Sequence, residues 1–534
     1  MNTGRRGWTL AAVGLATFVT SLDNTVVNVA LPSIQRDLHL SIAGLEWVVS
    51  AYLLVFASLL LVGGRLADRY GQRRLFLVGL ALFTGASLLA GLAGSGQALI
   101  AGRALQGVGA ALLVPTTLAI ISTTFRQERE RDLAVAAWSA IAALALALGP
   151  LAGGLLSQHG HWTWIFFINV PVGLLTLVVA RLAIPESHAG AAAGSLDLPG
   201  LATSTVGLFA LTYALIQGHE AGWTSPAVAG SLAAAALAGA AFAAVESRVR
   251  APMVDVSLFR SRVFTGGTAA MVLWGLGVMG VYFFASLYLQ GILGFSPTRA
   301  GLAFVPLALL MAAGAPLASA LAARIGANRT VAAGFVLVAA GLLAVSRLGE
   351  GAGLADLMPG FALVGVGSGL TMPLTSTILG VLPPDRAGVA SGILNAAREM
   401  SGLLGVTVIG AILTTRQTTA LGHGATPAQA FLAGYTTGLV AAAALVLVGA
   451  VLTLRVLDHQ SVASGTRPAP TQPDSGRTAL TAPVGLPRRP HAAAPASLAS
   501  TPRRPAPAHR VPRPRPRPAA AAADGRGGYE THLP

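Results

Sequence analysis

Continuously apolar segments of about 20 residues recur along this chain and set what it can fold into. About 20 mostly apolar residues are needed for a helix to cross the hydrocarbon core of a bilayer. The segments lack the alternation typical of an outer-membrane barrel. The sequence therefore predicts an all-α membrane protein with 14 transmembrane helices. The predicted spans are 8–30, 43–63, 75–95, 98–121, 133–157, 164–184, 199–217, 226–245, 263–290, 298–322, 328–347, 355–379, 389–415 and 428–455.

Composition agrees with a membrane setting and excludes several kinds of site. Of the 534 residues, 54% are hydrophobic and only 10% are charged, whereas about 25% are charged in a soluble domain. The chain has no cysteine, which excludes disulfides and cysteine-ligated metals. It also lacks histidine pairs with zinc-like spacing and a phosphate-binding Gly-x-x-x-x-Gly-Lys loop. We therefore expect no metal, no cofactor, no ATP-driven pumping and no enzyme.

The net charge of +15 does not indicate a nucleic-acid partner, because of where the charge lies. All 35 basic residues are arginine, and eleven of them follow Ser461, with Asp474, Asp524 and Glu530. Of the rest, eighteen flank one side of the predicted spans, and Arg36, Arg299, Arg347 and Arg416 flank the other. Basic residues favour cytoplasmic loops. The even number of spans then places both termini in the cytoplasm, and the arginine-rich, alanine-rich composition suggests a bacterial cell (inner) membrane.

Residues 456–534 differ from the rest of the chain. They are rich in proline, alanine and arginine, and such a segment buries too little apolar surface to fold. We expect a disordered cytoplasmic tail. It is either attracted to anionic lipid headgroups or dispensable.

Two short patterns recur at nearly constant offsets. Arg69-Tyr70-Gly71 is matched by Arg324-Ile325-Gly326, 255 residues later, and Val108-Gly109 by Val366-Gly367, 258 residues later. The spacing predicts six-helix bundles over 1–185 and 263–455, with two additional helices over 186–262. Parallel repeats of this kind hold a substrate between them near the middle of the membrane.

Asp23 and Arg103 are charged residues inside predicted spans. Charged side chains within a membrane are costly and usually functional. The helical rise of 1.5 Å places Asp23 about 10 Å and Arg103 about 8 Å from the same surface. We expect them to pair, and Asp23 to carry a transported proton, since arginine does not titrate. Alternatively, Asp23 is a structural group bonded to Asn24, Asn28 or backbone, and Arg103 only joins helices.

Two further segments suggest moving parts. The loop after the second span contains the candidate latch residues Gly64, Arg65, Asp68, Arg69, Gly71, Arg73 and Arg74. A role in topology alone is the alternative, but Asp68 adds nothing to orientation. The fifth span contains Gly149, Pro150, Gly153 and Gly154, which suit a hinge, because small residues permit close approach and proline bends a helix. Ordinary tight packing would also explain them.

Polar and aromatic side chains within the spans are candidates for lining a substrate cavity. In the ninth span, Met271, Trp274, Val278 and Tyr282 recur at helical spacing, which fits a packing face or a promiscuous cavity wall. Arg398 and Glu399 either meet a charged substrate or pack near the cytoplasmic end. The candidate cavity residues are Asn24, Asn28, Gln106, Trp274, Tyr282, Arg398 and Glu399.

Four of these patterns together resemble those of the major facilitator superfamily, specifically its fourteen-span drug:proton antiporter family. They are Leu22–Pro32, Gly64–Arg74, Arg103 with Gln106, Gly107 and Gly109, and Gly149–Pro150 with Gly153 and Gly154. The similarity extends over about residues 8–455. The resemblance implies a fold of two six-helix bundles with two inserted helices. It also implies proton-driven export of hydrophobic or amphipathic drugs by alternating access.

The chain departs from the family pattern at a few positions. Ala145 and Thr163 replace a usual glycine and a usual arginine, and spans nine and ten lack the extra acid of some dication exporters.

The expected partners are a small organic substrate, protons and the bilayer. The alternatives are export of a metabolite, siderophore or lipid by the same fold, and a non-transporting membrane sensor.

Overall fold

The computed structural model describes residues 3–125, 127–186, 197–249, 252, 254, 256–382 and 387–457. Within these residues, 14 helices are long and apolar enough to cross a bilayer, which confirms the predicted number. From residue 458 onward, the predicted tail lies outside the described residues. Arg126, Arg250 and Arg386, three of the eighteen arginines on the arginine-rich side of the predicted spans, lie outside them too.

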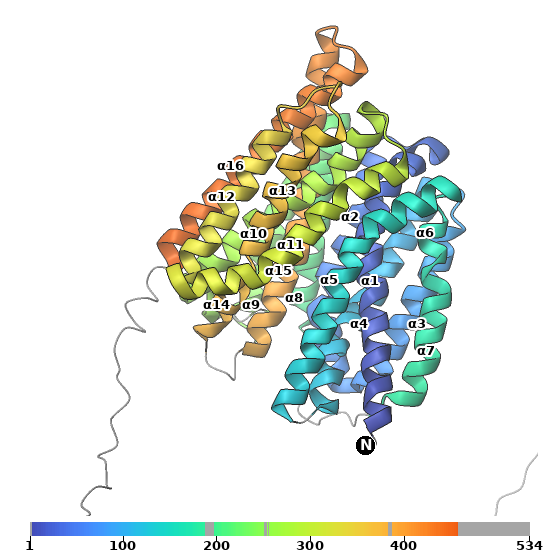
Figure 1. Ribbon diagram of the computed structural model, residues 1–534, viewed down its shortest axis with the longest axis vertical. Coiled ribbons are helices and arrows are strands. Elements are labelled where there is room, and N and C mark those ends of the chain that lie inside the picture. The colour runs from blue at the N-terminus through green and yellow to red at the C-terminus, as the bar shows by residue number, and fades with distance from the viewer. Residues whose placement is uncertain are drawn as a thin grey trace, which may run out of the picture. The chain divides into compact units, whose positions relative to one another are not determined.

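Two six-helix bundles and an inserted helical hairpin make up the fold (Figure 1). The first bundle contains α1 (Thr3–Leu38), α2 (Ile42–Tyr70), α3 (Gln72–Gly91), α4 (Gly96–Thr124), α5 (Glu128–His159), α6 (Trp164–Phe167) and α7 (Asn169–Ala183), of which α6 and α7 together form one span. The hairpin contains α8 (Leu198–Ala221) and α9 (Pro226–Glu246). The second bundle contains η1 (Val256–Arg260), α10 (Arg262–Leu287), η2 (Tyr288–Ile292), α11 (Pro297–Ile325), α12 (Ala327–Val345), α13 (Leu354–Leu370), α14 (Pro373–Gly380), α15 (Ala387–Gly422) and α16 (Pro427–Leu457).

Several helices differ from the predicted spans in their ends or continuity. Helix α1 continues to Leu38, past the predicted end at residue 30, because a hydropathy pattern measures the apolar core and not the full helix. The predicted span 355–379 is divided between α13 and α14. Pro373 stands at the start of α14, where its missing N–H costs nothing.

The two bundles share local geometry at the repeated motifs. Gly71 ends α2 with φ 97°, and Gly326 ends α11 with φ 92°, a region that favours glycine. A Cβ on Gly109 would lie 2.6 Å from a backbone nitrogen of α3. One on Gly367 would lie 2.8 Å from a backbone nitrogen of α12. Equivalent helices therefore cross closely in both bundles.

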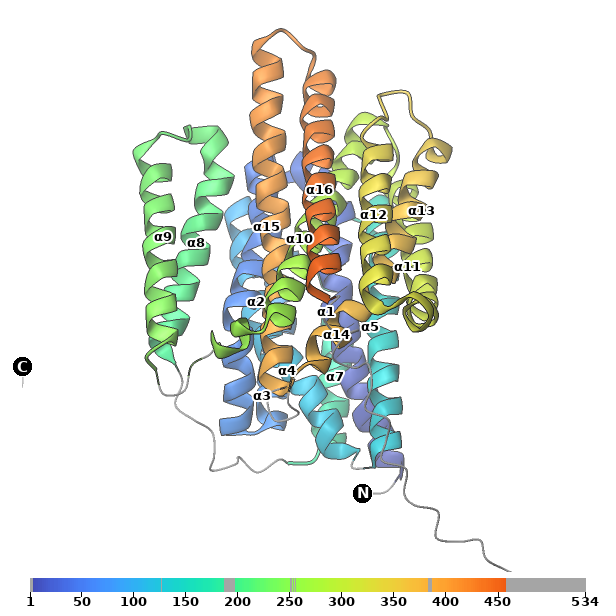
Figure 2. The same ribbon diagram turned by 90° about the vertical axis from the view of Figure 1, so that its left-hand side faces the viewer.

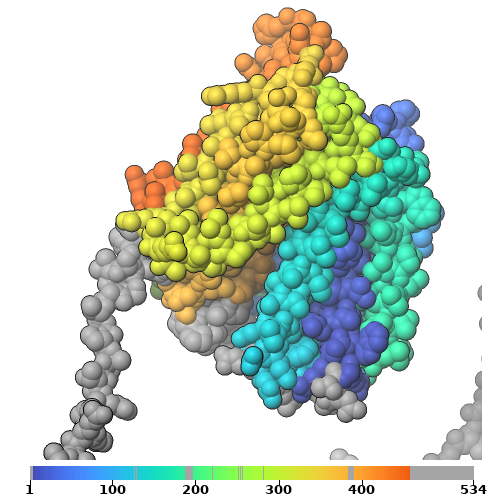
Figure 3. All heavy atoms as spheres, viewed as in Figure 1, coloured from blue at the N-terminus to red at the C-terminus, as the bar shows by residue number. Residues whose placement is uncertain are grey.

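The helix ends define two faces of the molecule. We call the face with the start of α1 and the turn at Gly71 the N face, and the opposite face, with the α1–α2 connection, the far face. Near the far face the Gln290 side chain donates to the Val29 carbonyl, at 2.8 Å, across the two bundles. Helix α5 packs against α11 there (Figure 3), and the two helices diverge toward the N face (Figure 1). The hairpin α8–α9 lies beside α2 and α15 (Figure 2).

Candidate functional site

Asp23 and Arg103 form a buried ion pair between α1 and α4. Arg103 Nη1 lies 2.5 Å from Asp23 Oδ2. The side chains are 0% and 1% exposed, respectively. The pairing expected from helix depth is therefore present. A buried charge that is left uncompensated costs about 3–5 kcal/mol, so the Asp23 carboxylate depends on the Arg103 cation.

Amide side chains complete the surroundings of the Asp23 carboxylate. Gln106 Nε2 donates to Asp23 Oδ1 at 3.0 Å and to Ser87 Oγ at 2.8 Å. Asn169 Nδ2, from α7, donates to the same Asp23 oxygen at 2.9 Å. Arg103 Nη1 also donates to Gln106 Oε1 at 2.9 Å. One carboxylate thus connects α1, α4 and α7, and α3 joins them through Ser87.

Helix α2 holds the other side of the Arg103 guanidinium. Arg103 Nε donates to the Val48 carbonyl at 3.1 Å. Its Cζ lies 4.4 Å from the centre of the Tyr52 ring and 5.9 Å from that of Phe166. A desolvated cation–π contact contributes about 2 kcal/mol. Arg103 therefore retains favourable contacts in the absence of an ionised Asp23.

Four residues at or near this site were not predicted from the sequence: Asn169, Ser87, Tyr52 and Glu46. Asn169 and Glu46 could have been recognised, since each is a polar residue inside an apolar span. Glu46, in α2, is 0% exposed. A Cβ on Gly410 of the second bundle would lie 2.7 Å from its Cδ, so this acid borders the interface between the bundles.

Replacing Asn169 with Leu should reduce transport several-fold. The change removes a donor to the Asp23 carboxylate, and a hydrogen bond to a charged group contributes about 1.5–3 kcal/mol. Transport into vesicles tests this. Thr176→Val is the control on the same helix, because the Thr176 hydroxyl donates to the Val172 carbonyl within α7. Equal transport by the two variants would contradict a specific role of Asn169 at Asp23.

The glycines predicted as a hinge lie between α1 and the second bundle. A Cβ on Gly149 would lie 2.9 Å from Thr25 Cβ, and one on Gly153 would lie 2.5 Å from the Val26 carbonyl oxygen. Thr25 and Val26 follow Asp23 closely on α1. A Cβ on Gly154 would lie 2.9 Å from Thr298 Cα of α11. Helix α5 therefore touches the helix carrying Asp23 on one side and α11 on the other.

Pro150 takes part in the same contact between the bundles. A Cβ on Gly301 of α11 would meet the Pro150 carbonyl oxygen. The Thr298 hydroxyl donates to the Gly154 carbonyl at 3.3 Å, and the Thr298 backbone N–H donates to Gln158 Oε1 at 3.1 Å. The motif thus provides close packing, and it does so at the junction of the two bundles.

Replacing Gly154 with Ala should separate α5 from α11 near the far face and lower transport several-fold. The new Cβ would be too close to the backbone of α11, and overpacking costs about 1–3 kcal/mol. The cysteine-free chain permits a direct measurement. Cysteines at Gln158 and Thr298 should cross-link less in the Gly154→Ala protein. Gly85→Ala is the control, because a Cβ there meets nothing within 4 Å. Unchanged cross-linking would contradict the prediction.

In the loop predicted as a charged latch, Arg65 and Arg73 bind groups outside the loop. Arg73 Nη1 lies 3.1 Å from Glu186 Oε1, and Arg65 donates to the Pro252 carbonyl. The Arg69 guanidinium lies over the Tyr70 ring. Asp68 is exposed and forms no ion pair within the described part of the chain.

Arg74 is exposed at the start of α3, and Gly64 lies beside Pro115 of α4. Gly71 supplies the turn that joins α2 to α3. The sequence therefore indicated the turn in this loop. A charged latch around Asp68 that forms in one state and breaks in another stays a prediction.

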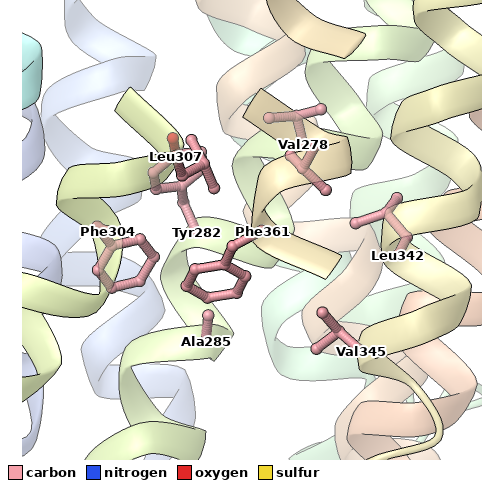
Figure 4. A pocket seen from close by; sticks show the side chains of 9 residues that line it. Val278, Tyr282, Ala285, Phe304, Leu307, Leu342, Val345 and Phe361 are labelled. Carbon is pink, nitrogen blue, oxygen red and sulfur yellow. The ribbon is translucent and has the colours of Figure 1, made fainter. Parts of the chain in front are cut away.

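The candidate cavity residues of the second bundle divide into two groups. Trp274 is 9% exposed and belongs to the apolar core, as expected for a packing face. Tyr282 lines a pocket within the second bundle and stacks on Phe304 at 5.4 Å, and Phe304 stacks on Phe361 (Figure 4). The sequence pattern alone did not separate these two environments.

The remaining candidates in this set lie on α1 and α15. Asn24 and Asn28 are half-buried on α1. Glu399 is half-buried on α15, and its carboxylate is close enough to interact electrostatically with Tyr52 of the first bundle. Its neighbour Arg398 is exposed. Of this adjacent pair, Glu399 is thus the residue that approaches the buried charges.

Comparison with known proteins agrees with this geometry. The family model described as "Major Facilitator Superfamily" matches residues 13–406. The puromycin resistance protein pur8 of Streptomyces alboniger is 39% identical over 469 residues, covering 86% of this chain and 93% of that protein. The cephamycin export protein CmcT of Amycolatopsis lactamdurans is 39% identical, covering 82% and 90%. The multidrug efflux pump LfrA of Mycolicibacterium smegmatis is 34% identical, covering 88% and 93%.

Solved structures share the fold at low sequence identity. The bacterial homolog of the human lysosomal transporter Spinster, in an inward-facing and occupied conformation, has a TM-score of 0.65 at 15% identity, covering 88% of this chain and 100% of that one. The POT family transporter PepTSo has a TM-score of 0.64 at 15% identity, covering 87% and 99%. The resemblance inferred from the four sequence motifs is confirmed, and this chain belongs to the major facilitator superfamily.

Proposed function

We propose that this protein is a proton-coupled antiporter that exports hydrophobic or amphipathic drugs or antibiotics across a bacterial cell membrane. The observation that carries the proposal is the buried Asp23–Arg103 pair. It supplies an acid that can gain and lose a proton inside the membrane, beside a cation that cannot. The relatives named for drug resistance and export support the choice of cargo.

Protonation of Asp23 is the switch in this mechanism. It removes the negative charge opposite Arg103 and leaves the guanidinium bound to Gln106, the Val48 carbonyl and the Tyr52 ring. Arg103 then binds α1 less strongly, and its contacts with Val48 and Tyr52 of α2 become the dominant ones. A membrane potential of 100 mV provides about 2.3 kcal/mol per charge, or about 50-fold accumulation.

Packing supports a route from Asp23 to the second bundle. Helix α1 contacts Gly149 and Gly153 of α5 just beyond Asp23, and α5 contacts α11 through Gly154. A displacement of α1 therefore acts on the junction near the far face. Contiguous packing of this kind is a physical basis for coupling once two arrangements exist. We infer that the bundles rock about a central site that includes Glu399 and alternately open to each side.

The proposed orientation has both termini, and hence the N face, in the cytoplasm. It is supported by the arginine asymmetry of the loops. The bundles touch near the far face, so the arrangement described here corresponds to closure toward the outside. We propose the same domain limits as the sequence predicts. The bundles comprise residues 1–185 and 263–455, the two additional helices lie within 186–262, and the tail comprises 456–534.

Everted membrane vesicles provide the direct test. Adding a transported compound should cause proton release from acidified vesicles, in a panel that includes puromycin, a cephamycin and lipophilic cations. A pump should retain this activity without residues 461–534, whereas a sensor that signals through the tail should fail. Transport that persists after the electrochemical gradient has been collapsed would refute proton coupling.

A further inference from the structure

Two buried carboxyl groups lie together at the base of the inserted hairpin, away from Asp23. Asp197 caps the start of α8, where its Oδ1 accepts from the Gly200 N–H at 2.8 Å. Glu246 ends α9, where its Oε2 accepts from the Val254 N–H at 3.1 Å. The two residues are 4% and 3% exposed. In each residue, therefore, one carboxyl oxygen accepts a hydrogen bond from a backbone N–H, and the second oxygen does not take part in that bond.

The two remaining oxygens converge. Neither Asp197 Oδ2 nor Glu246 Oε1 has a hydrogen-bond donor within the described part of the chain. Both lie beside Gly200, where a Cβ would meet Asp197 Oδ2 and lie 2.9 Å from Glu246 Oε1. The carboxyl groups are within hydrogen-bond reach of each other. Two ionised carboxylates at this separation repel strongly, whereas one shared proton satisfies both oxygens.

The surrounding charges fit a pair with a single negative charge. Among the described residues, the charged side chains that act on Glu246 are Asp197 from α8 and Arg65 from α2. Arg65 also donates to the Pro252 carbonyl, in the segment where the Val254 N–H is held by Glu246. One positive group thus acts on the carboxyl pair, and Arg65 and Glu246 hydrogen-bond to the nearby backbone of Pro252 and Val254, respectively.

We propose that Asp197 and Glu246 form a second proton-binding site, which holds the base of the hairpin closed and keeps Val254 and Pro252 in contact with Glu246 and Arg65. Loss of the proton places two negative charges together in a buried site and loosens these contacts. Arg65 belongs to the loop between α2 and α3. The site therefore makes that loop sensitive to pH at the N face, independently of the Asp23–Arg103 switch.

The sign of the pH dependence follows from proton linkage. In this proposal the folded pair holds one shared proton, and the two carboxyl groups release it when unfolding separates them. The folded state then binds more protons, so this pair makes stability fall as pH rises. In Asp197→Asn the amide donates permanently to Glu246 and no proton is needed. The same holds for Glu246→Gln.

The test is thermal unfolding of the full-length protein in detergent over a pH series, without substrate or gradient. The wild-type Tm should fall on going from acidic to alkaline pH more steeply than that of Asp197→Asn or Glu246→Gln. Asp132→Asn, an exposed acid on the same face, should keep the wild-type slope. In parallel, each single variant should lose one protonated-carboxyl band from the infrared spectrum near neutral pH.

The outcomes distinguish this site from the transport mechanism. Wild-type pH slopes in both single variants, with the infrared band retained, would overturn the proposal, as would failure of both near-isosteric variants to fold. A flattened slope supports it even when no compound is transported, because the measurement needs no transport. Conversely, drug-dependent proton release can succeed while this proposal fails.

Discussion

Replacing Asp23 with Asn should abolish proton-driven accumulation while leaving the protein inserted and folded. The amide keeps an oxygen that can accept from Arg103, and Arg103 keeps its bonds to Gln106 and Val48. The variant cannot carry a proton. At 100 mV, accumulation in vesicles should fall from about 50-fold to near unity.

The controls for Asp23→Asn separate coupling from binding and folding. Glu350→Gln removes an exposed acid near the far face and should leave accumulation unchanged. Counterflow exchange of labelled substrate needs no net proton movement, so it should survive in the Asp23→Asn protein. Full accumulation in that protein would refute the role given to Asp23. Loss of counterflow together with accumulation would point to a structural or binding role instead.

The Arg103→Leu variant should show the largest loss of stability of any single change at the site. It leaves the Asp23 carboxylate without its cation at a position with 0% exposure, and uncompensated buried charges cost about 3–5 kcal/mol. Transport should be lost as well. Thermal unfolding in detergent, measured alongside vesicle transport, tests both expectations.

A double variant distinguishes the charge effect from lost packing. Asp23→Asn combined with Arg103→Leu removes both charges, so most of the stability should return while transport stays absent. Arg103→Lys keeps a charge but cannot reproduce the contacts of the guanidinium with Val48 and Gln106, and should be intermediate in stability. If the double variant were as unstable as Arg103→Leu, the guanidinium would act mainly through packing against Tyr52.

Local sequence patterns predicted the larger part of this fold. The number and approximate limits of the membrane helices follow from apolar length, because the hydrocarbon core sets that length directly. Gly71 and Gly326 could be recognised as repeated turn positions, since few other residues adopt their backbone angles. Helix rise placed Asp23 and Arg103 at similar depth on helices of one bundle, and the two side chains are in contact.

Hydropathy and charge pattern were enough to identify the segments that cross the membrane and the charges that lie within it. They did not reveal that Asn169 reaches Asp23, that Gly154 faces α11 while Gly149 faces α1, or that Asp197 meets Glu246. Hydropathy and helical rise are properties of one helix alone, whereas these contacts join different helices. Which residue a side chain contacts depends on the direction in which it points from its helix and on which helix packs against that side.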